Sequence, residues 1–196
     1  MSIPLSPRSY LPAMCALLLL SAAPIRAQDS ALPFTPIPFD DLSAFRDVGE
    51  NWRVAVGVAA DRESDLRPLA GTGVLVNLPS ADHRSNLFTA VEHGDVEIEL
   101  DFLVPKGSNS GIYLMGRYEI QVFDSWGVDP PRFSDAGGIY QRWDERRGEG
   151  REGYEGHPPR VNASRAPGLW QHLRILFQAP HFDQAGRKIA DARFVL

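Results

Sequence analysis

The chain has 196 residues, a formal net charge of −5 and a single cysteine, Cys15. The acidic balance argues against a nucleic-acid partner, because affinity for nucleic acid comes largely from cations that neutralise phosphates. One cysteine excludes a disulfide within the chain, so the fold must depend on a hydrophobic core. About 170 residues are enough to build one such core as a single domain.

The first 27 residues have the pattern of a secretory signal peptide. Arg8 precedes an apolar run over residues 11–23, and Ala27 offers a small residue for cleavage. The apolar run is too short for an ordinary membrane span. We therefore expect an exported protein, periplasmic or extracellular, without a membrane span; a membrane anchor is the alternative. Loss of Arg8 and Arg26 with this segment would take the net charge to about −7.

A Pro-rich segment, residues 28–38, leads into a domain that we expect over residues 39–196. No amphipathic helical period of useful length occurs after the signal peptide. Strand-like runs follow one another at short intervals, with Gly and Asp between them. The runs are residues 52–60, 72–78, 86–91, 96–104, 111–123 and 170–179, and another begins at residue 190. This pattern predicts an all-β antiparallel sandwich.

The runs 96–104 and 111–123 alternate between apolar and polar residues, so each places its two kinds of side chain on opposite faces. Turn-forming residues, 105–110, separate them, and we expect the two strands to pair across that turn. The apolar positions of these runs and of the run at 170–179 should be buried. They are Leu100, Phe102, Ile112, Leu114, Ile120, Val122, Ile175 and Phe177.

The polar face of the two runs has two interpretations. A solvated outer face is ordinary for an antiparallel sheet. A binding site is the alternative, because acids lie beside Arg117 and aromatic rings, and flat rings with bidentate hydrogen-bonding groups suit a sugar. Glu97 and Glu99 would lie about 7 Å apart along one strand. Paired carboxylates in glycoside cleavage use such separations, but any i, i+2 pair has the same spacing.

The stretch from residue 127 to 168 is long and rich in Gly, Pro, Arg and acids. Loops of this length inside compact domains are usually either functional or disordered. Trp143, Tyr154 and His157 favour a functional loop over the rim of the sheet, and a plain surface loop is the alternative.

Six motifs follow one another along the chain. They are GSNSGIY at 107–113, GRYEIQV at 116–122, GIY at 138–140, PPRVNAS at 158–164, PGLWQ at 167–171 and APHFD at 179–183. Together they resemble the bacterial 3-keto-disaccharide hydrolase domain family, over roughly residues 39–196. The resemblance implies a concanavalin A-like jelly roll with a sugar groove on its concave sheet. Members usually continue with further strands, so we expect the domain to be incomplete at its C-terminus.

The resemblance also implies cleavage of glycosides that carry a ketone at C3, that is, 3-keto-disaccharides. The ketone acidifies the proton on C2, so a base can remove it and the bond at C1 can break by elimination; direct hydrolysis is the alternative. Such a step needs a base and a group that stabilises the enolate, either an arginine or a metal. The expected catalytic residues are Glu119, Asp124, Arg117 and His157. Glu119 is the preferred base, held ionised by Arg117.

We expect the substrate, an oligosaccharide or glycoside, to lie on one concave surface with Glu119. The expected contact residues are Glu97, Glu99, Gln121, Tyr113, Trp126, Tyr140, Trp143 and Asn162. The sequence identifies no cofactor with certainty and leaves a divalent metal open, which would take Glu97, Glu119 and Asp124. Because fold does not fix function, a non-catalytic carbohydrate-binding module is the second hypothesis, and a structural or adhesion domain the third.

Overall fold

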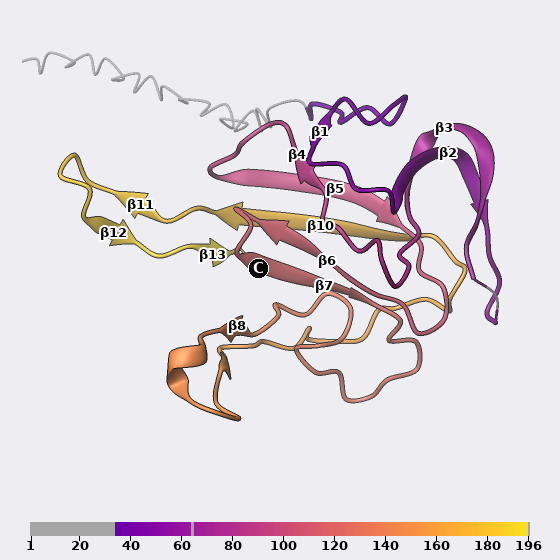
Figure 1. Cartoon of the computed structure of the whole chain (residues 1–196). Coiled ribbons are helices and arrows are strands. Elements are labelled where there is room, and N and C mark those ends of the chain that lie inside the picture. Colours follow the sequence, from indigo (N-terminus) through magenta and orange to yellow (C-terminus); the bar gives the residue numbers. More distant parts are fainter. Residues whose placement is uncertain (1–33, 64, 196) are drawn as a thin grey trace, which may run out of the picture. The chain divides into compact units, whose positions relative to one another are not determined.

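The computed structural model describes residues 34–63 and 65–195, so the predicted signal peptide lies outside the described residues. The chain divides into two units, residues 1–35 and 36–196, and the fold described below is that of the second. Its described residues form β-strands and one short 3₁₀ helix (Figure 1), and no described helix is long and apolar enough to span a membrane. The prediction of an all-β antiparallel fold is confirmed.

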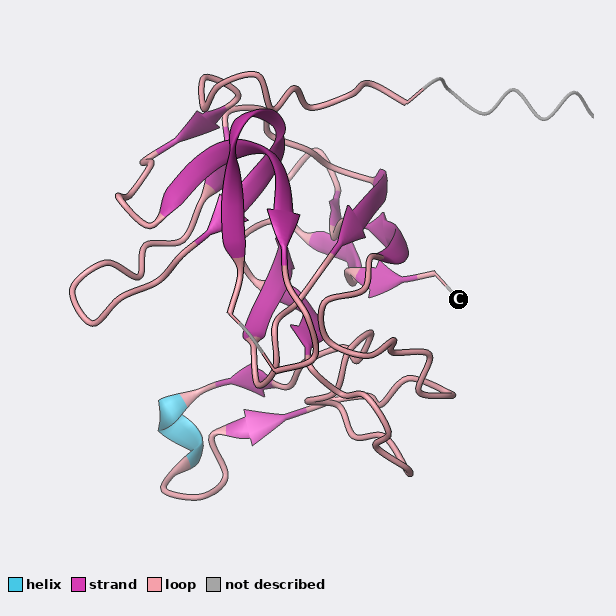
Figure 2. Ribbon diagram, turned by 90° about the vertical axis from the view of Figure 1, so that its right-hand side faces the viewer, coloured by secondary structure: helices cyan, strands magenta, loops and turns pink. Residues whose placement is uncertain are grey.

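The strands pair in small antiparallel sheets, with the orders β1-β4, β2-β3, β13-β10-β5, β6-β7, β8-β9 and β11-β12. Their bounds are β1 Phe45–Arg46, β2 Trp52–Ala59, β3 Arg67–Asn77, β4 Phe88–Thr89, β5 Val96–Phe102, β6 Asn109–Leu114, β7 Tyr118–Phe123, β8 Arg142–Trp143, β9 Gly153–Tyr154, β10 Gln171–Gln178, β11 His181–Phe182, β12 Lys188–Ala190 and β13 Arg193–Phe194. The 3₁₀ helix η1, Glu145–Arg147, lies between β8 and β9 (Figure 2).

The core lies between the β13-β10-β5 sheet and the β6–β7 hairpin. Its buried members are Leu114, Ile120, Ile175, Phe177 and Ala179. Phe177, on the central strand β10, is 2% exposed and contacts aromatic rings from both layers. Two layers packed through their apolar faces are consistent with a β-sandwich. Because the pairings do not form two continuous sheets, the jelly-roll strand order stays a prediction.

Of the eight residues predicted to be buried, five are buried, and Leu100, Phe102 and Ile112 are half-buried. These three share one property: each lies on a strand that has a partner on one side only in its sheet. β5 pairs only with β10, and β6 only with β7. The apolar face was therefore assigned correctly. A single strand partner does not by itself explain the incomplete burial, because Leu114 lies on β6 as well and is fully buried.

The predicted pairing of 96–104 with 111–123 is wrong. β5 pairs with β10, some 70 residues further along, with Ile98 opposite Ile175 and Val96 opposite Phe177. This pairing puts apolar side chains of two strands on one face against the hairpin. The turn after β5 therefore leads the chain into the other layer instead of returning it beside β5.

The run 111–123 is also not one strand, because residues 115–117 form the turn of the β6–β7 hairpin. Met115 and Gly116 both have positive φ, 54° and 62°, and Arg117 N–H donates to Leu114 O at 3.1 Å. The Met115 N–H donates to His93 Nε2 at 3.1 Å, which supports this unusual conformation of a non-glycine residue. Leu114 faces Tyr118 across the hairpin, so the alternation continues through the turn and conceals it.

The long stretch 127–168 is tied to β7 by backbone hydrogen bonds. Gln121 N–H donates to Gly138 O, and Tyr140 N–H donates to Glu119 O, both at 2.9 Å. Ile139 forms bridges with Ile120 on one side and with His157 on the other. The segment 137–140 therefore runs antiparallel beside β7. It leads directly into β8, η1 and β9, so these elements begin at the same edge of the hairpin.

Candidate functional site

A hollow of about 730 Å³ lies where the β6–β7 hairpin meets the segment that leads into β8. Both strands of the hairpin, its turn, the segment 139–143 and β9 contribute to the walls. The side chains that matter for its chemistry are Tyr113, Arg117, Glu119, Tyr140, Arg142 and Trp143. Five of these six are predicted site residues. The lining also contains Tyr118, Gln141, Tyr154 and Glu155, which were not predicted as site residues.

Glu119 projects from β7 directly opposite Tyr113 of β6. The Tyr113 hydroxyl donates to Glu119 Oε2 at 2.6 Å. The other oxygen, Oε1, lies over Gly111, where a Cβ would come within 2.1 Å of it. A glycine at position 111 is therefore what leaves room for the carboxyl to reach the tyrosine.

Partial burial raises the pKa of the Glu119 carboxyl above its ordinary value, and the hydrogen bond from Tyr113 lowers it in part. Burial and the nearby carboxyl together raise the pKa of Tyr113 well beyond its ordinary range, so the phenol keeps its proton and stays a donor. The predicted effect of Arg117 is wrong. Arg117 lies in the exposed hairpin turn and is not among the causes of the Glu119 shift, which is toward the neutral form.

Arg142 and Tyr154 face each other across the β8–β9 pair. The Arg142 guanidinium lies 4.9 Å from the centre of the Tyr154 ring, and its Nη1 donates to Glu155 Oε2 at 2.8 Å. Its Nε is buried and has no hydrogen-bond partner in the described structure. A buried, oriented donor without an acceptor at the wall of a hollow fits an oxygen-bearing ligand.

Two aromatic rings complete the walls of the hollow. Tyr140 is held by an edge-on contact with Phe133, with ring centres 5.4 Å apart. Trp143 is 63% exposed at the rim. Exposed aromatic side chains beside a few oriented polar groups are the usual composition of a small-molecule site.

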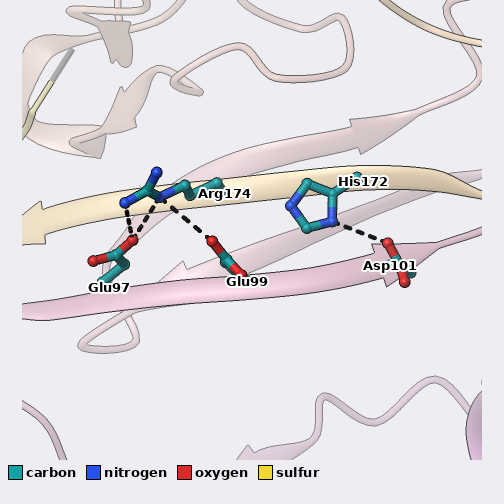
Figure 3. Close-up of polar contacts among 5 residues, drawn as sticks. All are labelled: Glu97, Glu99, Asp101, His172 and Arg174. Atoms are coloured by element: carbon teal, nitrogen blue, oxygen red, sulfur yellow. Dashed lines mark hydrogen bonds and ion pairs between the residues drawn. The ribbon is translucent and has the colours of Figure 1, made fainter. Parts of the chain in front are cut away.

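Glu97 and Glu99 lie on a different surface. Both project from β5 and form ion pairs with Arg174 of β10, while Asp101 pairs with His172 at 3.0 Å (Figure 3). The expectation of one shared concave surface is therefore wrong. Polar residues of β5 and β7 both point away from the core, and because the two strands lie in opposite layers, they point to opposite sides.

Three further predicted residues hold loops together. Asp124 accepts from the backbone N–H of Gly107 at 2.9 Å. Gln121 is buried and donates from Nε2 to Ser134 O at 3.1 Å. Asn162 donates from Nδ2 to the backbone oxygens of Ser125 and Val128, at 2.6 and 2.8 Å.

The last two predicted residues also lie outside the lining of the Glu119 hollow. The side chain of His157 is exposed, and its backbone pairs with Ile139. Trp126 lines a second, separate hollow.

The three acids proposed as metal ligands do not come together. Glu97 pairs with Arg174, Asp124 closes a loop, and Glu119 lies in the hollow with Tyr113 hydrogen-bonded to it. Among the described residues, no group of three or more His, Cys, Asp or Glu side chains is placed to hold a metal ion.

Arg142 is the candidate residue that the predicted set lacks. The signal for it is local: the run Tyr140-Gln141-Arg142-Trp143 interleaves aromatic, amide and guanidinium groups. Tyr154, also in the long stretch, faces it only because β8 and β9 pair.

A half-buried carboxyl of raised pKa, an oriented guanidinium and exposed aromatic rings on an all-β scaffold define a class of site that suits ring-shaped, hydroxyl-rich ligands. Residues 39–192 match the sequence model of the 3-keto-alpha-glucoside-1,2-lyase-like domain, and the chain belongs to this family. The predicted family is confirmed. Neither the curated proteins nor the solved structures contain a significant match to the chain.

Proposed function

We propose that this chain is an exported enzyme that cleaves 3-keto-glycosides by elimination in the hollow around Glu119. The observation that supports it best is the state of that carboxyl. It is half-buried, has a raised pKa and has a tyrosine hydroxyl rather than a cation beside it. Membership of the family supplies the substrate class, and the signal-peptide pattern of residues 1–27 supports export.

Glu119 acts as the general base. A ketone at C3 of the sugar acidifies the C2 proton, and a carboxylate with a raised pKa is a stronger base than an exposed one. The electron pair of the C2–H bond first forms an enolate, with its charge on the C3 oxygen. When the C3 carbonyl forms again, the double bond between C1 and C2 forms and the C1–O bond breaks toward the departing group. The proton on Glu119 then returns to the departing oxygen, which restores the carboxylate. Addition of water to the product double bond would complete a net hydrolysis.

Arg142 stabilises the charge that develops on the C3 oxygen. Its buried Nε has no hydrogen-bond partner in the described structure, and Glu155 and Tyr154 fix the orientation of its guanidinium. A donor that is already oriented costs no reorganisation when the enolate forms. Tyr113 keeps the carboxyl of Glu119 in place, and Tyr140 and Trp143 provide flat surfaces for the sugar ring.

The test compares Glu119→Gln with Glu97→Gln on a 3-keto-disaccharide, with product formation followed by mass spectrometry. Both changes are nearly isosteric, and both remove one carboxylate from an alternating strand. Loss of a general base should lower kcat by about 10² to 10⁴-fold, whereas Glu97→Gln should leave the rate unchanged.

Equal rates for wild type and Glu119→Gln would refute the role of Glu119. If the wild type binds the 3-keto-disaccharide and does not cleave it, the carbohydrate-binding module becomes the better hypothesis. In that case Glu119→Gln would retain the affinity of the wild type.

A further inference from the structure

A second hollow, of about 440 Å³, lies beyond the far end of β7 from Glu119. The loop 126–131 and the segment 160–164 form its walls, and the side chains of interest are Trp126, Asp129, Arg160, Val161 and Ser164. Phe123 lies four residues after Glu119, about 13 Å along β7, and Trp126 follows three residues later. The two hollows therefore lie at opposite ends of one strand and share no lining residue.

Hydrogen bonds of buried or half-buried side chains fix the loop that carries Trp126. Ser125 is fully buried, and its hydroxyl accepts from the Ala136 N–H at 2.9 Å. Asn162 binds the backbone oxygens of Ser125 and Val128, on either side of the tryptophan. Two polar side chains, those of Ser125 and Asn162, thus fix the loop backbone. Because the loop backbone is already fixed, its exposed side chains lose little conformational entropy when a ligand binds.

The loop presents apolar surface to solvent. Trp126 is 51% exposed and Val161 is 70% exposed, and both line the hollow. The guanidinium of Arg62 lies 4.6 Å from the centre of the Trp126 ring, which orients the indole further. The hollow therefore combines an oriented, exposed indole ring with a largely polar lining, and a few placed polar groups beside an aromatic ring are typical of a small-molecule site.

The polar groups of this hollow include donors and an acceptor without partners. Arg160 is exposed, and its guanidinium makes no hydrogen bond or ion pair within the described residues. The hydroxyl oxygen of Ser164 is buried and has no hydrogen-bond partner there. The carboxylate of Asp129 lies in the same lining and adds an acceptor. Donors, an acceptor and a flat ring together match the hydroxyl edges and the C–H face of a sugar.

We propose that the Trp126 hollow is a second carbohydrate-binding site, which takes a saccharide ring that is not itself cleaved. Trp126 stacks on the ring face, Arg160 and Asp129 bind hydroxyl groups, and Ser164 completes the hydrogen bonding at the floor. The proposal does not depend on catalysis at Glu119. It gives an exported enzyme a means of staying on a glycan while its other hollow acts on an end that carries the ketone.

The experiment measures binding of unoxidised maltohexaose, cellohexaose and xylohexaose to the full chain by calorimetry. These glycans carry no C3 ketone, so no cleavage interferes. At least one should bind more tightly than about 10 mM, and the indole N–H resonance of Trp126 should shift as it is added. Trp126→Ala should weaken that binding by about tenfold or more, as for other aromatic anchors. Arg160→Ala, at an exposed position, should weaken it severalfold without any risk to the loop.

Trp170→Ala is the matched control, because Trp170 is similarly exposed, at 44%, and lines neither hollow; its affinity should equal that of the wild type. The proposal is wrong if none of the three glycans binds, or if Trp126→Ala and Arg160→Ala bind as the wild type does. It is also wrong if Trp143→Ala, in the other hollow, abolishes binding while Trp126→Ala does not. A wild type that binds at Trp126 and cleaves no 3-keto-glycoside would sustain this site and refute the proposed function.

Discussion

The outer faces of β5 and β7 have the same sequence pattern and very different surroundings. On β5, Glu97 and Glu99 both pair with Arg174 on the neighbouring strand (Figure 3). On β7, Glu119 has no cation beside it; it is half-buried and accepts a hydrogen bond from Tyr113. A carboxylate that is paired with a guanidinium is a structural group, whereas a carboxyl that has lost water without gaining a cation is suited to proton transfer.

The difference comes from what covers each face. The segment 137–140 hydrogen-bonds along β7 and brings Tyr140 and β8 over Glu119. The Glu97 and Glu99 side chains on β5 stay 34% and 39% exposed, so water and Arg174 both remain available to them. The presence of this one covering segment on β7, and its absence from β5, thus makes the difference between a candidate active site and a solvated face of salt bridges.

Gly111→Ala should produce the largest effect of the changes that test this comparison. The new Cβ would occupy the position of Glu119 Oε1, so the carboxyl must move away from Tyr113. A displacement of about 1 Å in a catalytic group can lower the rate by about 10²-fold. The measurement is kcat on a 3-keto-disaccharide. Gly57→Ala is the control, because Gly57 lies in β2 with nothing within 4 Å of the added Cβ. Full activity of Gly111→Ala would contradict the placement of Glu119.

Alternation predicted much of this arrangement correctly. The prediction of which side chains of β6, β7 and β10 face the core is right for Leu114, Ile120 and Phe177. This prediction is right although the predicted strand pairing is wrong. The turn at 115–117 pairs Leu114 with Tyr118 and so keeps the even-numbered residues of both strands on one face. Parity is a local property of the backbone, and a short turn preserves it.

Strand partners and electrostatics could not be predicted in the same way. The pairing of β5 with β10 is decided by packing between segments some 70 residues apart, which no local pattern encodes. The pKa of Glu119 depends on cover from the segment 137–143, within a stretch that the sequence predicted as a functional loop without indicating that it runs along β7. Arg117 is two residues from Glu119 in sequence, yet it lies in the turn and exposed, so adjacency gave the wrong sign for the shift.

The pH dependence of catalysis should sharpen the comparison further. Only ionised Glu119 can accept a proton, and its raised pKa means that this form is lost at a higher pH than for an ordinary glutamate, about 4.3. We expect kcat/KM to fall about tenfold per pH unit on the acid side, with a midpoint above that value.

Tyr113→Phe tests the direction in which the acid-side midpoint of kcat/KM moves. It removes the hydrogen bond that lowers the pKa of Glu119, so the midpoint should move to still higher pH. An acid limb at or below the ordinary value, or a shift to lower pH in Tyr113→Phe, would rule out Glu119 as the group that titrates.

The smallest effect should come from the other face. Arg174→Gln removes the cation that both Glu97 and Glu99 share and leaves two carboxylates near each other on β5. Because Arg174 is 56% exposed, solvent screens most of this interaction, and the loss in the free energy of unfolding should be below about 1 kcal/mol. The loss should shrink further in 1 M salt, where the screening length is about 3 Å.

Denaturant unfolding of Arg174→Gln at low and high salt measures this loss of stability. Its kcat should not change, because the outer face of β5 lies on the opposite side of the core from Glu119. A fall in kcat without a fall in stability would mean that the β5 face belongs to the active site after all, and the distinction between the two faces would fail.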